Sequence, residues 1–164
     1  VSMESVELDE LAKDVVNNLR DHAEKKNISL DYCGIPINIQ GVRHVLYEML
    51  YNIADNAVRY TNPGGHIHIY VGRKGNRPFY RVEDDGIGIP DDKMEELNAY
   101  NAKDSEALYR VQTQSQGDRT HLGVINVISR LKLYYQENAE VIYMRNKTGG
   151  TTVKIKIKTA SEKT

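Results

Sequence analysis

Apolar residues recur with helical spacing in several segments of the chain. The clearest segment runs from Leu46 to Thr61, which contains no proline or glycine and is stopped by Pro63-Gly64-Gly65. With residues placed 100° apart, one broad apolar sector contains Val45, Leu46, Met49, Leu50, Ile53, Ala54 and Ala57. The same spacing predicts helices from Asp9 to about Lys26 and from His121 to Tyr135, and Pro90 is expected to open a short helix over Asp91 to Ala99.

Alternating apolar and polar residues predict strands between these helices. The expected strands are Ser2 to Leu8, Ile28 to Cys33, His66 to Arg73, Phe79 to Asp84, Val141 to Arg145 and Thr151 to Lys158. The third and fourth form a hairpin around Gly75-Asn76, and the last two form another. Gly34 to Gly41 and the long polar stretch Asn101 to Thr120 are predicted loops. We expect an α+β fold, a two-layer sandwich with a mixed, mostly antiparallel sheet and helices on one face.

Composition narrows the choice of protein class. A chain of 164 residues fits one domain with a sizeable core, here residues 1–159 followed by a loose tail at 160–164. The net charge of −1, with both signs mixed, gives no electrostatic reason to expect nucleic acid or an anionic membrane. Cys33 is the only cysteine, which excludes an internal disulfide. No apolar run reaches the ~20 residues needed to span a bilayer, no signal peptide is found, and the start at Val1 suggests an excised fragment.

A polar stripe runs along the edge of the apolar sector of the central helix. Glu48, Asn52 and Asn56 are spaced four apart, and Arg59 continues the line. Asn56 falls inside the apolar sector, where an unpaired amide costs roughly 1–3 kcal/mol. Either backbone groups satisfy this amide, as in an ordinary core asparagine, or it has a ligand.

A second motif follows about thirty residues later. A predicted strand ends in Asp84, and Gly86 and Gly88 come directly after it, separated by one residue. Glycine at these positions allows positive φ and close approach of the backbone to a ligand. Asp-Gly turns are common, so this motif alone fits a plain hairpin turn.

Taken together, the two motifs resemble the ATP-binding domain of the GHKL superfamily, and within it the catalytic domain of sensor histidine kinases. The matching "N box" has the pattern N-x-x-x-N-A-x-[KR]-Y and consists here of Asn52, Asn56, Ala57, Arg59 and Tyr60, followed by Thr61, Gly64 and Gly65. The resemblance identifies residues 1–159 as a histidine kinase-like ATP-binding catalytic domain.

The resemblance also implies roles for individual residues. Asn56 would offer its side-chain oxygen to the Mg²⁺ held by the ATP phosphates, which suits a hard ion that takes oxygen ligands. Arg59 would face the phosphates as the candidate catalytic residue, and Tyr60 would pack against the nucleotide. Asp84 would accept from the exocyclic amine of adenine but oppose the carbonyl oxygen of guanine. The other expected nucleotide contacts in these two motifs are Asn52, Gly86, Gly88 and Ile89.

Two further boxes match less closely or less specifically. Gly123 and Ile125-Asn126-Val127 fit the second glycine-rich box, whose helix amides meet the phosphates, but larger residues replace the flanking glycines. Leu122, Gly123 and Val124 are therefore expected nucleotide contacts in a box that holds nucleotide loosely, or under a lid over Asn101 to Thr120 that closes differently. Thr151, after Gly149-Gly150, would place its hydroxyl near Asp84 and the adenine through water.

The residue one turn before Asn56 bears on the choice between kinase and hydrolase. Superfamily members that hydrolyse ATP carry Glu there as a base for the attacking water. This chain has Asn52, which cannot act as a base, and Glu48 lies roughly 6 Å further along the axis. The resemblance therefore favours a histidine kinase that uses ATP and Mg²⁺. A nucleotide-binding regulatory module with weakened or lost catalysis and an anti-sigma-type Ser/Thr kinase stay open as alternatives.

The phosphoacceptor is expected outside this chain. Of the five histidines, only His22 lies on a suitable predicted helix, and one helix cannot form the dimeric hairpin that carries an acceptor. His66 and His68 share a strand face and could bind metal, but nothing in the sequence completes a site. Expected partners are ATP, a His-containing dimerisation domain of the same protein and a downstream response regulator, with no nucleic acid and no direct membrane contact. The expected location is cytoplasmic, as the cytoplasmic part of a membrane sensor.

Overall fold

The computed structural model describes residues 3–103, 110 and 119–157, without the side chains of residues 119–124 and 137. The helices are α1 (Leu8–Lys25), α2 (Arg43–Tyr60), α3 (Asp91–Ala99) and α5 (Arg119–Tyr135), with short 3-10 turns at η1 (Tyr100–Ala102) and η2 (Gln136–Asn138). The strands are β1 (Glu4–Glu7), β2 (Ser29–Gly34), β3 (Asn38–Gly41), β4 (His66–Lys74), β5 (Arg77–Asp84), β6 (Ala139–Arg145) and β7 (Thr151–Ile157).

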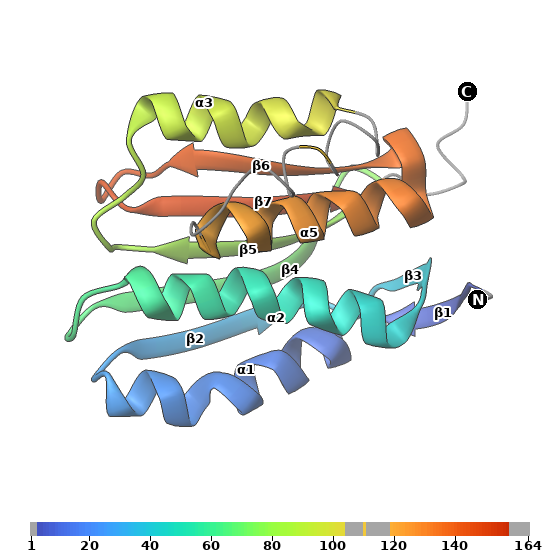
Figure 1. The fold of residues 1–164 in the computed structure, drawn as a ribbon. Helices are drawn as coiled ribbons and strands as arrows, with labels where there is room; N and C mark the ends of the chain where they lie inside the picture. The colour runs from blue at the N-terminus through green and yellow to red at the C-terminus, as the bar shows by residue number, and fades with distance from the viewer. Residues whose placement is uncertain (1–2, 104–109, 111–118, 158–164) are drawn as a thin grey trace.

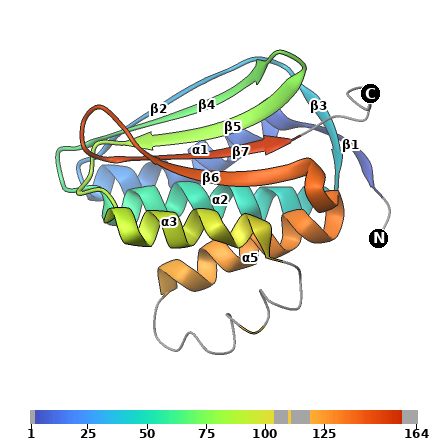
Figure 2. The ribbon, with the colours of Figure 1, turned by 90° about the horizontal axis from the view of Figure 1, so that it is seen from above.

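The larger sheet has the strand order β2-β4-β5-β7-β6. β2 and β4 pair in parallel, and the other neighbours pair antiparallel. All the labelled helices lie on one side of this sheet, and its other side is left bare by the described residues (Figures 1 and 2). The predicted α+β two-layer sandwich is confirmed. The two predicted hairpins, β4–β5 and β6–β7, both form within it.

The core lies between the helices and the sheet. Side chains spaced three or four apart on α1 and α2 meet the inward residues of the central strands, including Leu11, Leu19, Met49, Ile67 and Ile69. Tyr80 is fully buried in this layer, and its hydroxyl donates to the carbonyl oxygen of Leu50 at 2.9 Å. Burial raises the pKa of Tyr80, so the hydroxyl keeps the proton it donates. This bond fixes the central strand β5 to the middle of α2.

The predicted loop over Gly34 to Gly41 was wrong in its second half. β3 occupies Asn38–Gly41 and pairs antiparallel with β1, with Val6 opposite Ile39. The alternation is too short to be recognised alone, and the strand forms because Ile37 and Ile39 are buried against the core.

The predicted starts of two helices were also shifted. α1 begins at Leu8 and is capped by Glu7, whose carboxylate accepts from the N–H of Glu10 at 3.4 Å. Asp9, the expected start, is buried and accepts a hydrogen bond from the hydroxyl of Tyr32 on β2. α2 begins at Arg43, earlier than the predicted Leu46.

The outer edge of β6 is covered by amide side chains from α3 and η1. Asn98 donates to the carbonyl oxygen of Tyr143 at 2.9 Å and accepts from its N–H at 2.7 Å. Asn101 makes the same pair of bonds with Val141, at 2.6 Å and 3.1 Å. Each amide therefore satisfies both backbone groups of one edge residue, and α3 is held against β6.

The end of α2 is capped by a lysine from α1's C-terminal turn. The ammonium of Lys26 donates to the carbonyl oxygens of Val58 at 2.9 Å, Arg59 at 2.6 Å and Thr61 at 2.9 Å. The last carbonyls of a helix lack intrahelical partners and carry the negative end of its dipole. Lys26 therefore fixes the end of the helix that carries Asn56 and Tyr60.

We expect Lys26→Met to lower the free energy of unfolding by about 1.5–3 kcal/mol, because methionine keeps the apolar stem but removes hydrogen bonds from a charged donor. Urea unfolding would measure the change. Lys25→Met is the matched control, since Lys25 is exposed in the last turn of α1 and its loss removes the same charge. Equal stability of the two variants would contradict a capping role for Lys26.

Candidate functional site

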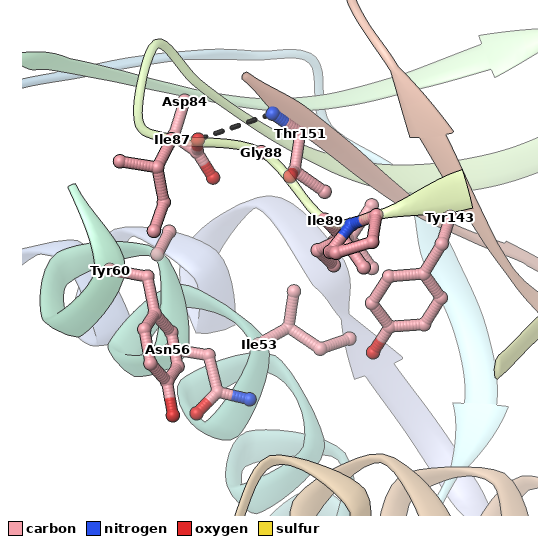
Figure 3. A pocket seen from close by; sticks show the side chains of 12 residues that line it. Ile53, Asn56, Tyr60, Asp84, Ile87, Gly88, Ile89, Tyr143 and Thr151 are labelled. Atoms are coloured by element: carbon pink, nitrogen blue, oxygen red, sulfur yellow. Dashed lines mark hydrogen bonds between the residues drawn. The ribbon is translucent and has the colours of Figure 1, made fainter. Parts of the chain in front are cut away.

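A pocket of about 200 Å³ lies between α2, the loop after β5 and the strands β6 and β7 (Figure 3). It is lined by Ile53, Asn56, Ala57, Tyr60, Asp84, Ile87, Gly88, Ile89, Pro90, Tyr143, Thr151 and Val153. Most of these side chains are apolar, and a few polar groups converge on them, which is typical of a small-molecule site. The two motifs that hold Asn56 and Asp84 therefore face the same pocket.

Asp84, at the end of β5, is held by two backbone donors. Its Oδ1 accepts from the N–H of Gly86 at 3.0 Å and from the N–H of Thr151 at 3.2 Å, the second drawn as a dashed line in Figure 3. Oδ2 accepts no hydrogen bond from the part of the chain that the structure describes, and it points toward the pocket (Figure 3). One acceptor is thus presented in a fixed direction.

The pKa of Asp84 lies above its usual range. Burial is the main cause, and the neighbouring Asp85 carboxylate raises it further, while the bonds from Gly86 and Thr151 oppose the shift. No described cation pairs with this carboxylate. Keeping an ionised carboxylate partly out of water in this way is costly for the folded state, and such a cost is common at functional sites.

Two glycines shape the loop that closes this end of the pocket. Gly88 has φ of +77°, and a Cβ there would lie 2.4 Å from the carbonyl oxygen of Gly149. A Cβ on Gly86 would lie 2.8 Å from the carbonyl oxygen of Tyr60. The loop can therefore touch both the end of α2 and the β6–β7 turn only because side chains are missing at these positions.

The residues of α2 divide into those that line the pocket and those that do not. Asn56 and Tyr60, one turn apart, both line it. The Asn56 amide is half-buried and makes no hydrogen bond with the described residues. Asn52 is half-buried outside the lining, and Arg59 is exposed and paired with Asp55 at 3.2 Å. Arg59 is therefore near the pocket but does not line it in this state.

The remaining predicted site residues lie on other segments. Ile89 and Thr151 line the pocket, and Thr151 touches Asp84 through its backbone N–H. Leu122, Gly123 and Val124 fall in the first turns of α5, and their side chains lie outside the described residues, as does most of the predicted lid.

The sequence did not identify several residues of the pocket wall: Ile53, Ala57, Ile87, Pro90, Tyr143 and Val153. The first two were assigned to the core because they share the apolar sector with true core residues. Tyr143 and Val153 are opposite each other in the β6–β7 register, far along the chain from both motifs. Only the strand order brings Tyr143 to the pocket, so no local signal could have found it, whereas Val153 could have been found because it shares a strand face with the predicted Thr151.

Glu48 does not line the pocket. Its carboxylate forms an ion pair with Arg130 of α5. Among the described residues, Asp84 is the only carboxylate that lines the pocket. Apart from Asp84, the lining of the pocket therefore offers no carboxylate from the described residues that could act as a base.

None of the described histidine side chains lines the pocket. His66 contacts Asp85 at 2.9 Å, His68 contacts Asp31 at 3.5 Å, and His22 is exposed on α1. Within residues 3–103, 110 and 119–157, no group of three or more His, Cys, Asp or Glu side chains is arranged to hold a metal ion.

The helices in these ranges also include none that is both long and apolar enough to cross a bilayer.

Comparison with known proteins defines the class. Residues 41–161 match the family described as histidine kinase-, DNA gyrase B- and HSP90-like ATPase, and the chain belongs to this family. Over 130 residues, or 79% of the chain, it is 31% identical to the sensor protein kinase PmrB of Pseudomonas aeruginosa, of which it spans 26%. It is also 28% identical over 86 residues to the heme sensor protein HssS of Staphylococcus aureus, covering 52% of the chain and 19% of that protein.

Solved structures show the same fold. The nucleotide-free catalytic domain of histidine kinase ThkA superposes with a TM-score of 0.76 at 17% identity, covering 96% of this chain and 97% of that one. Full-length ShkA in complex with AMPPNP gives 0.72 at 20% identity, covering 96% and 31%. The complex of ThkA with the response regulator TrrA gives 0.73 at 18%, covering 99% and 43%. These structures share the fold. The family match and the identity to PmrB show an ATP-binding, kinase-type catalytic domain like those of sensor histidine kinases.

We expect Asp84→Asn to change stability in a pH-dependent way. Because the folded-state pKa of Asp84 is raised, the folded chain binds more protons than the unfolded chain between the two pKa values, and stability falls as pH rises through this window. Asparagine does not ionise, yet its oxygen can still accept from Gly86 and Thr151. The free energy of unfolding of Asp84→Asn minus that of wild type should therefore increase from about pH 4 to about pH 7 in urea titrations.

Asp85→Asn is the control of opposite sign. The backbone N–H of His66 donates to Asp85 at 2.8 Å and holds the pKa of this carboxyl below its usual range. Its stabilisation is present above the unfolded-state pKa and is lost as pH falls through the folded-state pKa. The same difference should therefore decrease with rising pH for Asp85→Asn, and parallel slopes for the two variants would refute the assignment.

Proposed function

We propose that this chain is the catalytic domain of a two-component sensor kinase, which binds Mg-ATP in the pocket and donates the γ-phosphoryl group to a histidine on a separate dimerisation domain of the same protein. The observation that carries the proposal is that Asn56 and Asp84, from two motifs far apart in the sequence, line one apolar pocket from opposite sides (Figure 3). Each presents a polar atom that makes no hydrogen bond with the described residues.

The Asp84 side of the pocket suits adenine. Oδ2 is directed so that it can accept from the exocyclic amine. The pocket lining offers apolar walls to the base through Ile53, Ile89 and Val153. Guanine would place a carbonyl oxygen against the same carboxylate, leaving a buried charge unpaired. The Thr151 hydroxyl would complete the adenine contacts through water.

The Asn56 side suits the phosphates and their metal ion. A half-buried amide that makes no hydrogen bond with the described residues supplies an oxygen of the kind that Mg²⁺ takes, so Asn56 fits the role of metal ligand. When bound, Mg²⁺ neutralises charge on the phosphates. Tyr60 packs against the nucleotide, and Arg59 exchanges its contact with Asp55 for the phosphates. Asn52 and the amides at the start of α5, over Leu122, Gly123 and Val124, complete the phosphate site.

The chemistry requires positioning more than proton transfer. The imidazole nitrogen of the acceptor forms a bond to the γ-phosphorus as the bond from that phosphorus to the bridging oxygen breaks, and ADP leaves with the electron pair. Asn52 cannot activate a competing water, and Glu48 is engaged by Arg130. ATP is therefore kept for the histidine rather than hydrolysed.

The wider assembly follows from the relatives. PmrB is a sensor protein kinase, and ThkA binds the response regulator TrrA. By analogy, this chain would act beside a His-containing dimerisation domain, in the cytoplasmic part of a membrane sensor, with a response regulator receiving the phosphoryl group downstream.

We expect Asp84→Asn to weaken ATP binding by about 100-fold. The substitution removes the charge and places an amide NH2 group, which is a donor, where the adenine amine needs an acceptor. Calorimetric titration with ATP, ADP and GTP, with and without magnesium, would measure this change and the preference of the wild type for adenine. Asp85→Asn, which changes a neighbouring carboxylate outside the pocket, is the control. Wild-type affinity in Asp84→Asn would refute the adenine assignment.

Phosphotransfer tests the reaction itself. The chain, incubated with Mg-ATP and a separately produced His-containing helical hairpin domain, should yield acid-labile phosphate on that domain and none on itself. Asn56→Ala should abolish transfer and weaken magnesium-dependent binding while remaining folded, whereas Asn62→Ala, exposed just beyond α2, should behave as wild type. Acid-stable phosphate would instead indicate a Ser/Thr kinase, and nucleotide binding without transfer would indicate a regulatory module.

A further inference from the structure

The bare side of the large sheet carries a second cavity. It has a volume of about 320 Å³ and is lined by Lys74, Arg77, Phe79, Lys154 and Lys156, which we call the basic cavity. Neighbouring residues of a strand point to opposite faces, so Val153 lines the nucleotide pocket while Lys154 lines the basic cavity. The two sites are therefore separated by the thickness of the sheet.

The charge in the basic cavity is of one sign. Four of its five lining residues are cations, and no carboxylate belongs to the lining. The carboxylate of Glu83 on the same side of β5 is engaged by Arg81 at 3.0 Å. Glu140 stands opposite Lys156 in the β6–β7 register, but no ion pair joins them in the part of the chain described. The positive charge is concentrated on a chain whose net charge is only −1.

Lys154 is the strongest indication of a ligand. Its side chain is buried, with 9% of the residue exposed, and its ammonium lies 4.4 Å from the centre of the Phe79 ring. Burial lowers the pKa of Lys154, and the cations of Lys156, Lys74 and Arg81 lower it further. No described anion pairs with Lys154, whose ammonium lies over an aromatic ring with like charges around it, and an anionic group entering the cavity would supply this partner.

The aromatic rings here are already occupied by cations. The guanidinium of Arg81 lies 4.4 Å from the centre of the Tyr70 ring and 5.4 Å from that of Phe79. Bases of a single-stranded nucleic acid bind by stacking on open aromatic faces, which this surface does not offer. The spacing fits a peptide instead: Lys154 and Lys156 are two residues apart on β7, about 7 Å, the same repeat as alternate side chains of an extended chain.

We propose that the basic cavity binds an extended acidic segment of a partner protein, with carboxylates at alternate positions. One carboxylate pairs with Lys154 above Phe79, and the next pairs with Lys156 along β7. The site acts independently of nucleotide, because it faces away from the pocket that contains Asn56 and Asp84.

The test measures binding of a labelled Glu-Val-Glu-Val-Glu peptide to the whole chain. Fluorescence anisotropy at low and at high salt gives the affinity. Lys154→Met and Lys156→Gln should each weaken binding by about tenfold, since each removes one charged contact. Lys13→Gln on α1, in the opposite layer, removes the same charge and should bind as wild type. Saturating Mg-ATP should leave the peptide affinity unchanged, and rising salt should weaken it.

Several outcomes would overturn the proposal. These are the absence of saturable peptide binding, equal binding by the matched Gln-Val-Gln-Val-Gln peptide, and unchanged affinity in Lys156→Gln. Because Lys154 is buried, circular dichroism checks the fold of Lys154→Met, and Lys156→Gln decides alone if that variant unfolds. Lys156-dependent binding of inorganic pyrophosphate, phosphatidylserine vesicles or single-stranded DNA without binding of the acidic peptide would also refute it, and would identify a different ligand.

Discussion

Asp84 joins the loop after β5, the start of β7 and the β6–β7 turn at one end of the pocket. One of its oxygens holds the N–H of Gly86 in the loop after β5 and the N–H of Thr151 at the start of β7. Its backbone carbonyl accepts from the Asn146 amide at 2.8 Å, which ties the β6–β7 turn to the same point. The pocket is therefore organised around a group whose ionised form burial disfavours. This burial lowers the stability of the folded state, and it leaves Oδ2 as a hydrogen-bond acceptor directed into the pocket.

The two ends of the pocket are fixed by different kinds of interaction. The Asp84 end depends on backbone donors and on the absence of side chains at Gly86 and Gly88. The α2 end depends on a cation from another helix, because Lys26 binds the last carbonyls of the helix that carries Asn56. Arg59 takes part in neither set of interactions. It is exposed and paired with Asp55, one turn earlier on the helix, so it can change partner at little cost.

The local pattern of apolar and polar residues was enough to predict the helices, both hairpins and the residues that carry the two motifs, because each of these depends on residues close together in the sequence. It was not enough where distant segments meet. β3 forms only because β1 pairs with it and Ile39 finds the core. Tyr143 reaches the pocket only through the order of the strands. The basic cavity is likewise invisible in the sequence, since its lysines and arginine are spread over three strands in a chain of nearly neutral charge.

The amides of Asn98 and Asn101 have a consequence for self-association. An incoming strand that extended the sheet along the middle of β6 would need the N–H and C=O groups of Val141 and Tyr143, and these groups are already bonded to the two side chains. Chain-to-chain growth of the sheet is thereby blocked at this border without proline, bulge or charge. Pairing with another chain at this edge would first require α3 to detach. The helix therefore protects the β6 edge against aggregation.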